Sequence, residues 1–87
     1  MEEYIALPTV GEILKEEFMD PNGISQYKLA KETGMPISEI KDIVHGRRKV
    51  TADTSLRLSI YFGVSDKYFI SLQKDLDMRE LENTEKD

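Results

Sequence analysis

Three residues at a fixed spacing constrain the fold of this chain most. Within the stretch "ISQYKLAKETGMPISEIKDIVHGRRKV", Ala30, Gly34 and Ile40 follow the pattern A-x3-G-x5-I. Two short helices that cross closely need a small residue at the crossing, a residue free to take positive φ in the turn, and an aliphatic residue that fixes the second helix on the first. Leu29 before the turn and Ile43 after it complete an inner face. The spacing predicts a helix-turn-helix, although an ordinary helical hairpin in a small bundle also uses glycine turns.

Helix-start and helix-stop signals divide the rest of the chain. Thr9 and Glu12 have the spacing of a capping box, and the apolar residues after them recur with a 3.6-residue period. Similar signals predict further helices, whereas the period-2 alternation of strands has no useful length anywhere in the sequence. We therefore expect an all-α protein with five short helices. It should comprise an N-terminal lead-in over residues 1–7, a domain over residues 8–78, and a polar tail over residues 79–87 that frays.

The composition excludes several classes of function. The chain has 87 residues, enough for one small domain, with no cysteine and one histidine, His45, so neither a Cys/His pair nor a two-histidine zinc site can form. A Ser/His or paired-carboxylate mechanism stays open in principle, but carboxylates in an acidic chain are usually solvated surface. Apolar runs are short, and acids stand where a signal peptide carries basic residues. We expect a soluble cytoplasmic protein that is not an enzyme and uses no metal or cofactor.

Residues 8–77 resemble a known family. The stretches "GEILKEEF", "ISQYKLAK", "IVHGRRKVTADTSLRL" and "YFGVS" together are similar to HigA-type antitoxins among the lambda-repressor-like (XRE) helix-turn-helix proteins. The resemblance implies a five-helix lambda-repressor-like domain and a homodimer that binds a palindromic double-stranded DNA operator and represses its own operon. It also implies a co-encoded, basic RNase toxin of the HigB type that the protein neutralises. A plain repressor without a toxin is the alternative, and a bundle that acts only through protein contacts is a third hypothesis.

The distribution of charge agrees with DNA binding even though the chain as a whole has a net charge of -5. Residues 26–50 hold six basic and three acidic residues, whereas residues 1–25 hold six acidic and one basic, and residues 51–87 hold eight acidic and five basic. Positive charge is therefore concentrated on the helix-turn-helix segment, where phosphate would be met. The alternative interpretation of "RRK" is an ordinary linker exposed to solvent.

The expected DNA contacts follow from the motif, in which the second helix lies in the major groove and the helix before it crosses the backbone. By resemblance, the start of the first of these helices and the basic segment after the second meet phosphate, with Arg47 the strongest candidate. On the groove-facing helix, Ile37 is expected at a thymine methyl and Lys41 at guanine, while Ser38 bonds a base or a phosphate. The expected DNA-binding residues are Gln26, Tyr27, Pro36, Ile37, Ser38, Lys41, Arg47, Arg48 and Lys49.

Three polar residues beside this face receive other assignments. Glu39 stands where many of these antitoxins have arginine, so it either accepts from cytosine N4 or turns to solvent, and we expect solvent. Asp42 is expected on the outer face, where it pairs with Lys41 or Arg48 when DNA is absent. His45 is expected to form a hydrogen bond at the helix end rather than to contact DNA.

Two partner surfaces are expected elsewhere. In the last helix, Phe69, Leu72 and Leu76 form a narrow apolar seam that we assign to the homodimer interface, with Phe69 also expected in the core. In the first helix, Glu12 and Glu16 lie on the face opposite the apolar residues. RNase toxins bind RNA and tend to be basic, so we expect this acidic face to bind the toxin, with an ordinary solvated face as the alternative.

Overall fold

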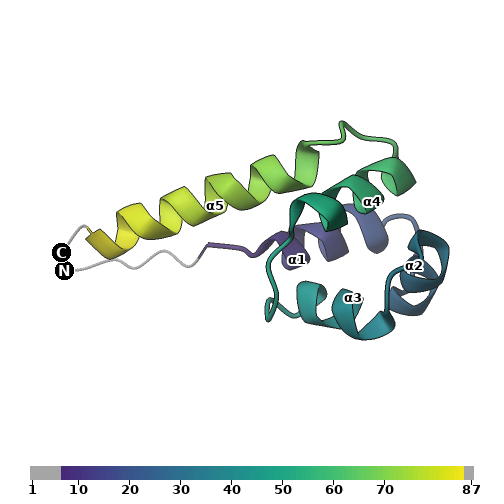
Figure 1. The fold of residues 1–87 in the computed structure, drawn as a ribbon. Coiled ribbons are helices and arrows are strands. Elements are labelled where there is room, and N and C mark those ends of the chain that lie inside the picture. Colours follow the sequence, from purple (N-terminus) through teal and green to yellow (C-terminus); the bar gives the residue numbers. More distant parts are fainter. Residues whose placement is uncertain (1–6, 86–87) are drawn as a thin grey trace.

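The computed structural model describes the backbone of residues 7–85 and the side chains of residues 7–83. Over this range the chain is all-α, as the sequence predicts, and α5 extends well beyond the bundle that the other helices form (Figure 1). Of the expected lead-in only Leu7 is described, and residues 1–6 lie outside the described part. The elements are α1 (Val10–Ile13), its π-helical continuation η1 (Leu14–Met19), α2 (Gln26–Thr33), α3 (Ile37–Val44), α4 (Ala52–Phe62) and α5 (Tyr68–Glu85).

The first helix begins at the predicted capping box. Thr9 Oγ1 accepts from the Glu12 backbone N–H at 3.1 Å, and Glu12 Oε1 accepts from the Thr9 N–H at 3.0 Å. Beyond Ile13 the helix widens into a π-helix, in which the Asp20 N–H donates to the Lys15 carbonyl five residues earlier, at 2.8 Å. Sequence reasoning missed this change because an α turn and a π turn differ by only one residue in hydrogen-bond spacing.

The helix-turn-helix between α2 and α3 confirms the first prediction. Ser25 caps α2 by accepting from the Lys28 N–H at 3.0 Å, and Gly34 ends it in the left-handed region at φ 74°. The N–H groups of Gly34 and Met35 both donate to the Ala30 carbonyl, at 3.0 and 3.1 Å. Because glycine has no Cβ, it takes this conformation without strain, and the chain turns directly into α3.

The inner side of α3 packs on α1 as well as α2. Ile40, Ile43 and Val44 are buried on that side. A Cβ placed on Gly11 of α1 would lie 1.8 Å from the Ile43 carbonyl oxygen, so the two helices meet backbone to backbone at this point. The close packing of α3 on the first helix therefore requires glycine at position 11.

An aromatic cluster closes the core between η1, α4 and α5. The ring of Phe18 lies 5.1 Å from Phe69 and 5.2 Å from Phe62 by centroid distance, and Phe69 is fully buried. This confirms the core position of Phe69 and contradicts its assignment to the dimer interface, because a side chain with no exposed surface cannot touch a second chain. Leu72 and Leu76 are partly buried against the same core.

The bounds of α5 differ from the expectation at both ends. The helix begins at Tyr68, and Ser65 precedes it in a turn in which Ser65 Oγ accepts from the Lys67 N–H at 3.3 Å. The prediction that the chain frays from residue 79 is wrong for residues 79–85, which continue the helix. Five of these seven residues are arginine, glutamate or leucine, which are good helix formers. Within residues 7–85 no helix has both the length and the apolar character that crossing a bilayer requires.

Candidate nucleic-acid interface

One side of α3 is presented to solvent because its other side is fixed in the core. Pro36, Ser38 and Lys41 are exposed, as a groove-reading face requires. Ile37 is partly buried and packs against the core, so only part of its side chain is available. The structure thus brings the four expected groove residues to the first two turns of one helix, with Ile37 as the least accessible of them.

The start of α2 carries the first group of expected phosphate contacts. Tyr27 is 75% exposed and Gln26 is half-buried. Both follow the Ser25 cap, at the end of the helix where backbone N–H groups favour an anion. An exposed tyrosine hydroxyl at this end is well placed to donate to a phosphate oxygen.

The basic segment Arg47–Lys49 follows α3 directly and is tied back to it. The backbone N–H groups of Arg47 and Arg48 donate to the Asp42 carbonyl, at 2.8 and 3.2 Å. Their guanidinium groups pair with the Asp42 carboxylate, Arg47 Nε at 3.2 Å and Arg48 Nη2 at 3.5 Å. The expected pairing of Asp42 with Arg48 is confirmed, and Arg47 shares the same carboxylate. All three basic side chains remain largely exposed.

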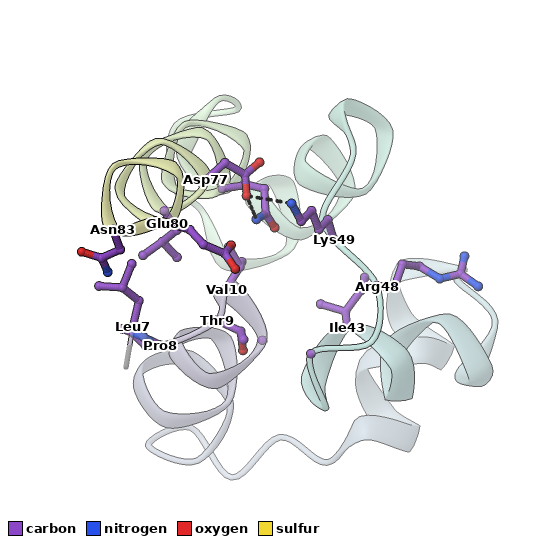
Figure 2. A pocket seen from close by; sticks show the side chains of 14 residues that line it. Leu7, Pro8, Thr9, Val10, Ile43, Arg48, Lys49, Asp77, Glu80 and Asn83 are labelled. Atoms are coloured by element: carbon purple, nitrogen blue, oxygen red, sulfur yellow. Dashed lines mark hydrogen bonds and ion pairs between the residues drawn. The ribbon is translucent and has the colours of Figure 1, made fainter. Parts of the chain in front are cut away.

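A second link, which the sequence did not suggest, joins the basic segment to α5. Lys49 Nζ lies 3.1 Å from Asp77 Oδ1, Gln73 Nε2 donates to the same oxygen at 3.0 Å, and Gln73 Oε1 accepts from the Val50 N–H at 3.1 Å. Figure 2 shows the Lys49–Asp77 pair at the edge of a cleft of about 250 Å³, with Lys49 directed toward Asp77 and Arg48 extending away from α5. The two contacts that join the basic segment to α5 connect residues more than 20 positions apart in sequence, so no local sequence pattern predicts them.

For two residues beside the exposed face of α3, the sequence prediction failed in one case, Glu39, and succeeded in the other, His45. Glu39 does not turn to solvent: it is half-buried, and its Oε2 accepts from Thr54 Oγ1 of α4 at 3.1 Å. A buried hydroxyl needs a partner, and this carboxylate is within reach. His45 matches its expectation, because its Nδ1 lies 2.8 Å from the Lys41 carbonyl at the end of α3.

The acidic face of the first helix is exposed, but its two expected residues differ in availability. Glu16 is exposed in η1, next to Glu17. Glu12 is also exposed, yet its carboxylate accepts the Thr9 N–H in the capping box. A partner that recruits Glu12 therefore competes with the start of the helix, whereas Glu16 and Glu17 carry no such hydrogen bond to the cap.

A solvent-facing helix presented across a glycine turn and followed by a basic segment defines a helix-turn-helix DNA-binding regulator. The helix-turn-helix family model (HTH_3) matches residues 14–69. Virulence-associated protein I of Dichelobacter nodosus is 42% identical over 69 residues, which are 79% of this chain and 64% of that protein. The chain thus spans less than two thirds of the length of that relative.

Two solved structures place the chain more narrowly among the helix-turn-helix regulators. The Pseudomonas aeruginosa antitoxin HigA, solved with the higBA promoter, has a TM-score of 0.81 at 31% identity, covering 85% of this chain and 80% of that one. An addiction module antidote protein of the HigA family from Coxiella burnetii has a TM-score of 0.79 at 34% identity, covering 87% of this chain and 83% of that one. The chain belongs to the HigA-type antitoxins of the helix-turn-helix family.

Proposed function

We propose that this chain is the antitoxin of a toxin–antitoxin pair, a homodimer that binds a palindromic operator in its own promoter and neutralises a co-encoded basic RNase toxin. The observation that carries the proposal is the exposed face of α3 next to the basic segment Arg47–Lys49, in a chain whose remaining charge is acidic. A relative of the same fold was solved with promoter DNA. The toxin and the dimer rest on the family and on the surfaces described next.

On DNA, α3 enters the major groove. Lys41 reaches guanine O6 or N7, and Ser38 bonds a base edge or a phosphate. The basic segment and the start of α2 hold the flanking phosphates, which fix the register without reading sequence. This division assigns specificity to α3 and most of the salt-dependent affinity to Arg47 and its neighbours.

The homodimer forms through α5. Leu72 and Leu76 lie four residues apart on one side of that helix, and both retain exposed surface beside the core. A symmetric contact along this seam covers apolar surface that a monomer leaves in water. It also presents two copies of α3 to half-sites about one helical turn, or 34–36 Å, apart.

The toxin binds the exposed acidic side of η1, centred on Glu16 and Glu17. Residues 1–25 carry six acidic residues and one basic residue, and charge of this sign accelerates association with a basic partner. Glu12 is the less suitable contact because its carboxylate closes the capping box. Because η1 is already helical in the toxin-free chain, binding on this side needs no coupled folding of η1.

The experiment pairs the chain with the protein encoded by the adjacent reading frame and measures the association rate at low and high salt. Glu16→Lys together with Glu17→Lys should slow association at low salt and leave promoter binding intact. Glu80→Lys with Glu82→Lys on α5 makes the same charge change away from η1 and serves as the control. If both pairs of substitutions slow association with the toxin equally, the toxin surface lies elsewhere on the chain. An adjacent protein that does not bind at all would favour a plain repressor.

A further inference from the structure

Glu39 connects the groove-facing helix to α4. It lies in the first turn of α3, between the exposed Ser38 and the buried Ile40. Its carboxylate is directed inward, where Oε2 accepts a hydrogen bond from Thr54 Oγ1 at 3.1 Å, and Thr54 is 2% exposed. The main packing partners of α3 are α1 and α2, so this hydrogen bond adds a link to α4 across 15 residues of sequence.

The direction of the hydrogen bonds around Thr54 follows from counting protons. A threonine hydroxyl has one proton, and Thr54 donates it to Glu39. Thr51 Oγ1 lies 3.1 Å from Thr54 Oγ1, so Thr51 must be the donor in that contact. Thr51 Oγ1 in turn accepts from the Thr54 backbone N–H at 3.3 Å as the N-cap of α4. The chain of donors runs from Thr51 through Thr54 and ends on the Glu39 carboxylate.

This chain of hydrogen bonds spans the two parts of the proposed DNA surface. Thr51 stands two positions after Lys49, the last residue of the basic segment, while Glu39 stands between the expected base-reading residues Ser38 and Lys41. We infer that Glu39 and Thr54 are positioning residues for sequence readout: their bond sets the orientation of α3 against the start of α4 and so fixes the base-reading side chains relative to the phosphate-binding segment. The inference rests on the proposed function and extends it to two residues that touch no base.

The competing explanation for any effect of Glu39 on DNA binding is electrostatic. A carboxylate near DNA lowers affinity for every sequence by repelling phosphate, whatever its hydrogen bonds. Two substitutions separate the explanations. Glu39→Gln removes the charge but keeps a side-chain oxygen that accepts from Thr54, whereas Glu39→Ala removes both. At the other end of the bond, Thr54→Val removes the hydroxyl, and the matched Thr54→Ser keeps it.

The test uses two duplexes of equal length, one from the chain's own promoter and one of scrambled sequence, with every variant shown by circular dichroism to be folded. Glu39→Ala and Thr54→Val should each reduce the preference for the promoter duplex by about five- to tenfold, the loss expected for one misaligned base contact. Thr54→Ser should keep the wild-type preference, and so should Glu39→Gln. The double variant Glu39→Ala/Thr54→Val should be no worse than either single variant, because both remove one bond.

The outcomes also separate this inference from the proposed function. If Glu39→Ala and Glu39→Gln raise affinity for both duplexes equally, the residue acts by charge alone and the inference is wrong. A wild-type protein that prefers its promoter, with Glu39→Ala and Thr54→Val unchanged in that preference, refutes the positioning role and leaves the proposed function standing. A wild-type protein that binds both duplexes equally refutes the proposed function and this inference with it.

Discussion

Lys49 Nζ lies 3.1 Å from Asp77 Oδ1, so a side chain expected at phosphate is paired with a carboxylate of α5 in the DNA-free protein. The pair is partly exposed, and such pairs contribute only about 0–1 kcal/mol to stability. Phosphate can therefore compete for Lys49 at small cost. On the proposed DNA surface, the pair would make the free energy of DNA binding depend on Asp77, a residue outside the helix-turn-helix.

Asp77→Asn should raise affinity for DNA of any sequence. The asparagine removes the charge that holds Lys49 but keeps an oxygen that accepts from Gln73 Nε2. We expect scrambled duplex to bind about two- to fivefold more tightly, as for the loss of one exposed ion pair. Asp75→Asn changes charge equally on the same helix but on the side lined by Lys67 and Tyr68, and is the control. If both variants behave alike, Asp77 contributes only to the net charge.

Gly11→Ala should destabilise the fold, although alanine is normally the better helix former. The new methyl group would lie 1.8 Å from the Ile43 carbonyl oxygen, so α1 and α3 must separate. Overpacking of this kind costs about 1–3 kcal/mol. Urea titration measures the loss.

Gly23→Ala is the comparison for Gly11→Ala. Gly23 has φ 65°, and no heavy atom beyond the glycine and its two chain neighbours lies within 4 Å of the position that a Cβ would take there, so alanine would suffer backbone strain without a steric clash. That strain amounts to about 1–2 kcal/mol. A Gly11→Ala protein as stable as wild type would show that the two helices have room to move apart.

Leu72→Glu with Leu76→Glu should convert the proposed dimer into a monomer. Placing two carboxylates on the seam leaves apolar surface of the partner unpaired and costs their desolvation. Sedimentation should give the monomer mass, together with weaker promoter binding. Met78→Glu with Leu81→Glu alters two side chains of α5 that are 56% and 51% exposed, and serves as the control. If this second pair alone dissociates the dimer, the interface lies on the other face of α5.

Tyr61 provides a prediction that depends on pH. Its hydroxyl donates to Glu32 Oε1, and this hydrogen bond, together with partial desolvation and the charge of Glu32, raises the pKa of Tyr61 above its ordinary value of 10.0. Because the pKa of Tyr61 is raised in the folded state, the hydrogen bond contributes its full stabilisation of the fold below the ordinary pKa of 10.0. This contribution is lost as the pH rises through the folded-state pKa.

Tyr61→Phe should therefore lower the melting temperature at about pH 8 and have a smaller effect at about pH 11. Tyr27→Phe removes a hydroxyl from a side chain that is 75% exposed and should leave the melting temperature unchanged at both pH values. A Tyr61→Phe effect that is the same at both pH values would indicate lost packing rather than a lost hydrogen bond.

Local signals predicted most of the fold. The capping box at Thr9 and Glu12, the cap at Ser25 and the left-handed turn at Gly34 each depend on residues within a few positions of one another, so sequence spacing specifies them. The π-helical turn after Ile13 and the continuation of α5 past residue 78 lack such a signal. Both depend on packing or on helix propensity summed over many residues.

The sequence predicted which residues form the candidate site, but not which residues they pair with in the fold. Charge distribution and motif geometry identified the basic segment and the exposed side of α3. The pairing of Lys49 with Asp77 and of Glu39 with Thr54 joins residues 28 and 15 positions apart by the numbering. Only the folded chain brings these partners together. The burial of Phe69, which contradicts its interface role, likewise depends on how η1, α4 and α5 meet.

The central claim is that α3 reads sequence while the basic segment holds phosphate. Fluorescence anisotropy on promoter and scrambled duplexes over a range of salt tests it most directly, with wild type, Lys41→Ala and Arg47→Ala. Wild type should prefer the promoter. Lys41→Ala should lose about 1–3 kcal/mol on the promoter alone, and Arg47→Ala should weaken both duplexes and flatten the salt slope by about 0.9. Equal wild-type affinity for both duplexes, or wild-type binding by both variants, would contradict the account.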